Sequence, residues 1–172
     1  MRRSSALPIA WISLRILILL NWLGGLAILA LLTATIVAEK WTFTALGITP
    51  ESAIPSMIMG LRAIAALGLV GVPLNYAVLK RLLAMVETVR SGDPFVAANA
   101  YRLLAIAWSL LALQLLSLVI AAVGKAISTP ANPLHLDAGF SINGWLAVLL
   151  TFVLARVFAL GTLMREDLDG TV

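Results

Sequence analysis

The sequence has no cysteine and only one histidine, His135, among its 172 residues. Disulfides, thiolate catalysis and cysteine-ligated metal sites are therefore excluded, and one histidine alone cannot build a histidine-based metal site. No Asp or Glu lies within the long apolar runs, so the carboxylate that a proton-coupled transporter titrates is missing. No Ser–His or paired-aspartate arrangement suits proteolysis within a membrane. We expect no metal, no cofactor and no enzymatic activity.

Charged residues are also scarce, at 12% of the chain against 62% hydrophobic residues. Soluble domains carry about a quarter charged residues, and a chain of this size could not hide such an apolar excess in a core. The apolar runs are continuous and reach the roughly 20 residues that a helix needs to cross a bilayer, without the alternation of barrel strands. The composition predicts an all-α integral membrane protein, a four-helix transmembrane bundle in one domain over residues 1–172.

Four segments are predicted to span the membrane, at about 14–37, 54–79, 97–125 and 142–164. Residues 6–13, with Trp11, are either interfacial or a helical extension of the first span. A polar connection containing Glu39 and Lys40 follows that span. In the second span, Pro73 should kink the helix, because proline removes one backbone hydrogen bond and clashes with the preceding turn.

A short amphipathic cytoplasmic extension of the second helix is predicted from Lys80 to Ser91. Apolar residues recur there at three- and four-residue spacing, with charged residues on the other face. Gly92 should end this helix. Asp93 offers an N-cap oxygen and Pro94 a pre-set first helical dihedral, so the third helix is predicted to start at that point.

Basic residues predict the orientation of the chain in the membrane. Lysines and arginines are more frequent in cytoplasmic segments, and the two sides of the predicted topology differ. Seven lie on the side of both termini and two on the opposite side: Arg2, Arg3, Lys80, Arg81, Arg90, Arg102 and Arg165 against Lys40 and Lys125. We therefore expect both termini in the cytoplasm. The apolar stretch from Ala6 to Ala38 is well beyond the 7–15 residues of a signal-peptide core, so we also expect an uncleaved first span. The net charge of +4 indicates contact with lipid headgroups rather than nucleic acid.

Arg62 and Arg156 are each predicted to lie about 12 Å inside a span, eight residues from its end. One interpretation is a cationic pocket for an anionic headgroup or substrate. The other is that each arginine ties helices together through backbone carbonyls and side-chain amides, with Arg156 held inside the bundle. Three glycines in the second span, Gly60, Gly68 and Gly71, are expected to permit close helix contact.

Two strings of residues on the cytoplasmic side form a candidate structural or partner site. The first runs from Gly92, Asp93, Pro94 and Phe95 to Asn99, Arg102 and Leu103, and the second holds Gly161, Leu163, Glu166 and Asp167. Together they resemble a bacterial family of small four-span membrane proteins, domain-of-unknown-function family 2975. The resemblance covers the whole chain in its span layout, but the sequence departs from it at Val96-Ala97-Ala98 and at Tyr101.

This resemblance implies a four-helix transmembrane bundle in a bacterial inner membrane and a neighbouring gene for a small helix-turn-helix regulator of the Cro/CI type. The leading hypothesis is a non-enzymatic accessory or regulatory protein with a cytoplasmic partner. The alternative is a small transporter or an anionic lipid- or anion-binding protein that uses Arg62 and Arg156.

The acidic tail is further predicted to fold back on the start of the third helix. Glu166 or Asp167 would pair with Arg102, Phe95 would pack beneath the pair, and Asn99 would bond a tail carbonyl. In the alternative, Arg102 meets lipid phosphate and the tail is solvated.

Overall fold

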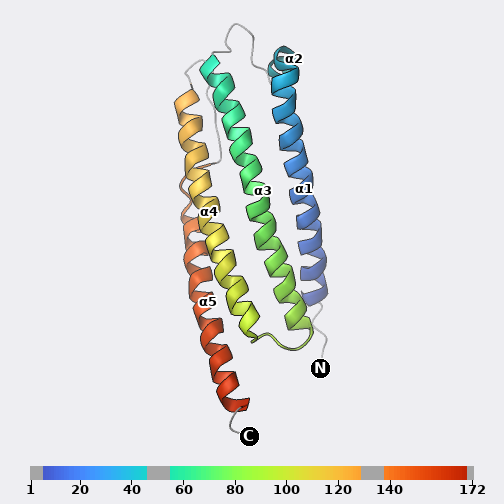
Figure 1. Ribbon diagram of the computed structural model, residues 1–172, viewed down its shortest axis with the longest axis vertical. Coiled ribbons are helices and arrows are strands. Elements are labelled where there is room, and N and C mark those ends of the chain that lie inside the picture. The colour runs from blue at the N-terminus through green and yellow to red at the C-terminus, as the bar shows by residue number, and fades with distance from the viewer. Residues whose placement is uncertain (1–5, 46–54, 129–137, 170–172) are drawn as a thin grey trace. The chain divides into compact units, whose positions relative to one another are not determined.

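The computed structural model describes residues 6–45, 55–128 and 138–169, and within these ranges the regular structure is helical, without strands. The helices are α1 (Ala6–Val37), α2 (Glu39–Ala45), α3 (Pro55–Arg90), α4 (Ala97–Ile127) and α5 (Ile142–Asp169) (Figure 1). Among the described residues, α1, α3, α4 and α5 are long and apolar enough to cross a membrane. The prediction of an all-α chain with four long apolar helices is confirmed, and their crossing of a membrane and its orientation stay predictions.

The structure is helical in two places where the sequence left the structure open or predicted a loop. Residues 6–13 belong to α1, so the alternative of a helical extension holds. The start of the predicted polar connection instead forms the short helix α2, whose first-turn Glu39 suits the positive end of a helix. The Thr42 hydroxyl lies 3.0 Å from the carbonyl oxygens of both Ala34 and Ala38, bridging the break between α1 and α2.

The predicted amphipathic extension is helical, because α3 continues through Pro73 to Arg90. Gly92 ends it with a positive φ of 88°. The amide of Gly92 bonds the Val89 carbonyl at 3.2 Å, and the amide of Asp93 bonds the Thr88 carbonyl at 3.1 Å. These two bonds form a Schellman motif, in which glycine takes the left-handed conformation that other residues adopt at a cost.

The predicted start of the third helix at Asp93 and Pro94 is wrong. Residues 93–96 are not helical, and α4 begins at Ala97. The Asn99 side chain donates to the Pro94 carbonyl, a local bond that competes with helix formation. Asp93 therefore does not cap α4, and its carboxylate is bound by Arg165.

The chain divides into two compact units, which we describe separately. Unit 1 comprises the described residues 6–21, 74–112 and 141–169. Its buried apolar side chains come from α4 and α5: Leu103, Ile106, Ala107, Val148 and Ala155. Their spacing of three, four and seven residues places each set on one helix face. The N-terminus of α5 is capped by Ser141, whose hydroxyl accepts from the Gly144 amide at 3.2 Å.

Unit 2 comprises the described residues 22–45, 55–73, 113–128 and 138–140. Close packing in this unit involves glycine. Gly25 lies against Val72, and Gly60 lies against the Ile127 side chain, so the expectation of close helix contact at Gly60 is confirmed.

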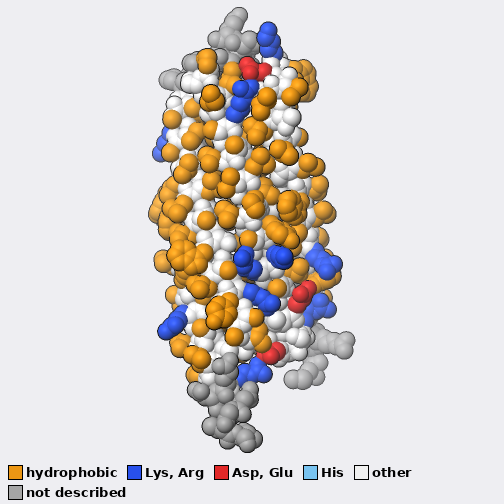
Figure 2. All heavy atoms as spheres, viewed as in Figure 1, with side chains coloured by type: hydrophobic (Ala, Val, Ile, Leu, Met, Phe, Trp, Pro, Cys, Tyr) orange, Lys and Arg blue, Asp and Glu red, His pale blue; other side chains and the backbone are white. Residues whose placement is uncertain are grey.

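Most large apolar side chains lie on the outside of the helices. Hydrophobic side chains are spread over the face seen in Figure 2. The exposed fractions of Leu19, Leu149 and Val153, for example, are 60%, 62% and 61%. In water such a surface would drive aggregation. In a bilayer, lipid tails would solvate it, and small-residue packing and polar bonds would hold the helices together.

Candidate functional site

A fully buried asparagine connects α3 to α4 within unit 1. Asn99 has no exposed surface. Its amide nitrogen donates to the Thr88 hydroxyl oxygen at 2.8 Å and to the Pro94 carbonyl at 2.9 Å. Its carbonyl oxygen accepts from Arg102 at 2.8 Å, and Arg102 also reaches the Ala84 carbonyl at 3.4 Å. We call these five residues the Asn99 cluster.

The cluster corrects one part of the predicted tail site. Both amide hydrogens of Asn99 are engaged by Thr88 and Pro94, so the predicted bond to a tail carbonyl is not formed. Thr88, which the sequence interpretation did not select, links the cluster to α3 and donates its own hydroxyl hydrogen to the Met85 carbonyl at 2.7 Å. In the sequence, the only feature that could have pointed to Thr88 is that it is a polar residue within the predicted amphipathic helix.

The end of α5 contacts the segment before α4 through a residue that the prediction did not choose. Arg165 donates to the Asp93 carboxylate, and both side chains are nearly half exposed. Glu166 and Asp167 lie in α5, but their side chains fall outside the part of the chain that the structure describes. Their pairing with Arg102 therefore stays a prediction.

Phe95 packs against α5. Its ring centroid lies 5.3 Å from that of Phe158, with the ring planes tilted by 33°. A side chain at Gly161 would place its Cβ 3.2 Å from the Phe95 ring, closer than most such contacts. Gly161 therefore gives Phe95 the room to lie against α5, and the two strings picked out in the sequence meet at this point.

Arg62 ties three helices of unit 2 together. Its guanidinium donates from α3 to the Glu39 carboxylate of α2 at 2.7 Å and to the Thr35 carbonyl of α1. The structural interpretation, contact with a backbone carbonyl, is therefore confirmed for Arg62. Its Nε is buried and has no hydrogen-bond partner among the described residues.

The Arg62–Glu39 pair leads to a prediction of modest size. In a double-mutant cycle with Arg62→Gln and Glu39→Gln, the coupling is expected to be about 0.2–1 kcal/mol, because both side chains are partly exposed and solvent screens their attraction. Thermal unfolding of the four proteins in detergent measures it. Additive effects would mean that Arg62 acts through the Thr35 carbonyl alone.

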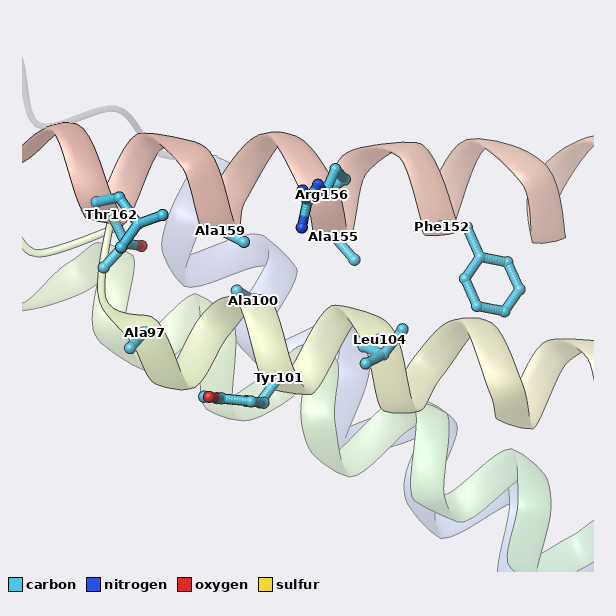
Figure 3. Close-up of a pocket in the computed structure, with 10 residues that line it drawn as sticks. Ala97, Ala100, Tyr101, Leu104, Phe152, Ala155, Arg156, Ala159 and Thr162 are labelled. Carbon is cyan, nitrogen blue, oxygen red and sulfur yellow. The ribbon is translucent and has the colours of Figure 1, made fainter.

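Arg156 lies differently from the prediction that it is held inside the bundle. It is exposed, and no described residue forms a hydrogen bond or ion pair with its guanidinium. The reason is its register: Ala155 and Thr162 occupy the buried positions of α5, so Arg156 points to one side of them. Arg156 lines a groove of about 590 Å³ between α4 and α5 in unit 1. Figure 3 shows its side chain lying against α5.

Comparison with protein-family models, curated proteins and solved structures finds no match. Membership of family 2975 therefore stays a prediction.

Proposed function

We infer that the chain is a non-enzymatic accessory or regulatory protein of the bacterial inner membrane. It has four spans with both termini in the cytoplasm, and it binds a partner protein at its cytoplasmic end. The binding surface comprises the non-helical segment 93–96, the first turn of α4 and the end of α5. The resemblance to family 2975 makes a small helix-turn-helix regulator the partner to look for, with no direct contact between this chain and nucleic acid.

The distribution of charge supports the orientation. Unit 1 holds seven of the ten described basic residues: Arg15, Lys80, Arg81, Arg90, Arg102, Arg156 and Arg165. Unit 2 holds Lys40, Arg62 and Lys125. The end of α3, the start of α4 and the end of α5 thus share a basic environment, which is typical of a cytoplasmic face.

The main support for the proposed partner site is the set of contacts that hold residues 88–102 in place. The Schellman motif, the Asn99 cluster and the Arg165–Asp93 ion pair all fix the same short segment. These restraints leave Phe95 44% and Tyr101 74% exposed. A surface that is ordered before binding loses little conformational entropy on association, and exposed aromatic residues are enriched at protein interfaces.

The absence of cysteine gives a direct test of topology. Ser91→Cys and Thr44→Cys each place one thiol at an exposed position of the described structure. A membrane-impermeant maleimide added to intact spheroplasts should label Thr44→Cys and leave Ser91→Cys unlabelled until the membrane is opened. The reverse pattern would contradict the proposed orientation.

The partner site is tested by a photo-crosslinking residue at Ala98, which is exposed in the first turn of α4. At native expression levels, we expect one discrete protein adduct, identified by mass spectrometry as a DNA-binding regulator. The same residue at Thr44 is the matched control and should not give this adduct. Adducts to lipid alone at Ala98 would contradict the proposal.

A further inference from the structure

The α4–α5 groove exists because small side chains face each other across it. Ala97 and Ala100 of α4 and Ala155 and Ala159 of α5 line it, so the two helices leave about 590 Å³ between them. This volume falls within the roughly 300–1,000 Å³ of ligand pockets in proteins. The whole groove belongs to unit 1, and none of its lining residues has a role in the Asn99 cluster.

The groove has a polar side chain on each of its two walls and is apolar at one end. Arg156 and Tyr101 lie on its two walls, whereas Leu104 and Phe152 line the part farther from Ala97. Phe152 is held there by an edge-on contact with Trp108, at 5.4 Å between ring centroids and 90° between planes. In Figure 3 the Tyr101 ring lies along α4 toward Ala97.

The charge of Arg156 requires a partner. A guanidinium within an apolar span is costly unless it is paired or reaches the headgroup region. No described residue supplies an oxygen to it. Elsewhere in unit 1, Arg102 bonds Asn99 and Arg165 bonds Asp93, so the missing partner distinguishes Arg156 from both. An anion from outside the chain would complete its hydrogen bonds.

We propose that this groove binds one anionic phospholipid. The phosphate accepts from the Arg156 guanidinium, and one acyl chain lies along Leu104 and Phe152. A free anion would leave the apolar part of the groove unfilled. A peptide would bring unpaired backbone groups into the hydrocarbon region. A phospholipid matches both the charge and the apolar surface. Ala97 and Tyr101 border the proposed partner surface as well, but the lipid site does not rest on the partner function.

Lipid binding is tested on the purified full chain in detergent by native mass spectrometry. Phosphatidylglycerol is compared with phosphatidylcholine carrying the same acyl chains. We expect one phosphatidylglycerol to be retained with an affinity about tenfold higher than that of phosphatidylcholine, and this preference to disappear in Arg156→Gln. Arg90→Gln, which removes an exposed arginine of unit 1 outside the groove, should keep it. Equal loss in both variants would indicate general attraction to anionic lipid and would overturn the site.

A second pair of variants tests the groove with Arg156 intact. Ala159→Leu fills the groove and should lower phosphatidylglycerol retention about tenfold, whereas Ala98→Leu, at an exposed position of α4 outside the groove, should not. Unchanged retention in Ala159→Leu would show that Arg156 only snorkels to the bulk headgroups.

Thermal unfolding separates a ligand site from a structural role. Without added lipid, Arg156→Gln should unfold at the wild-type temperature, since no described residue loses a partner. Phosphatidylglycerol should stabilise the wild type and leave Arg156→Gln unchanged. A lower unfolding temperature of Arg156→Gln without lipid would show a structural arginine. Equal stabilisation by inorganic phosphate would show a free-anion site. Either result would overturn the proposal.

Discussion

Asn99→Ala is expected to destabilise the protein by about 2–4 kcal/mol, among the largest effects of any single substitution in the chain. The reason is that the fully buried amide satisfies three groups at once: the Thr88 hydroxyl, the Pro94 carbonyl and the Arg102 guanidinium. Its removal takes one bond from each of them and leaves the Pro94 carbonyl without its Asn99 donor, whereas Thr88 keeps its bond to Met85 and Arg102 its long bond to Ala84. The effect is measured by thermal unfolding in detergent, monitored through the circular dichroism signal.

Asn75→Ala is the matched control for this prediction. Asn75 lies on α3 in the same unit, but it is exposed. Its substitution should change the free energy of unfolding by no more than about 0.5 kcal/mol. Equal effects of the two substitutions would show that the Asn99 cluster does not stabilise the fold.

Gly60→Ala is expected to destabilise the protein by about 1–3 kcal/mol, because the added methyl group overpacks unit 2. A Cβ at this position would meet the Ile127 side chain, with its Cδ1 at 2.7 Å and its Cβ at 3.2 Å. Ile127 is 8% exposed and β-branched, so its Cβ cannot move away without a shift of the α4 backbone. Chemical or thermal unfolding in detergent measures the loss.

Two further variants make this prediction specific. Gly24→Ala introduces the same methyl group at a helical glycine with nothing within 4 Å of the new Cβ, and it should leave stability unchanged or raise it slightly. Ile127→Ala should relieve the clash, so the double variant with Gly60→Ala should be more stable than the sum of the single effects predicts. Strict additivity would argue against the contact.

The four spans could be predicted from the sequence because each needs about 20 apolar residues, a property of composition alone. The start of α4 could not, because it depends on the side chain of a residue inside the helix. Asp93 and Pro94 fit a helix start by local rules, yet Asn99 binds the Pro94 carbonyl and Arg165 binds the Asp93 carboxylate. The second contact spans 72 residues and has no local signature.

The arginines show a similar limit. The sequence gives the depth of Arg62 and Arg156 through their distance from the span ends, but it does not give the face of the helix on which they lie. When apolar residues surround a helix on all sides, hydrophobic periodicity no longer indicates which face meets a neighbour. Arg62 meets α1 and α2, and Arg156 lies at the α4–α5 groove, because of packing that only the structure reveals.

The sequence separations in the Asn99 cluster have a consequence for the order of assembly during synthesis. Its bonds join residues that are 3, 5, 11 and 18 positions apart, so the whole cluster is present once the chain has been made as far as Arg102. Short-range contacts incur little loop-closure entropy and form early. The turn between α3 and α4 can therefore close while α5 is still inside the ribosome, and Arg165 later docks onto a segment that is already in place.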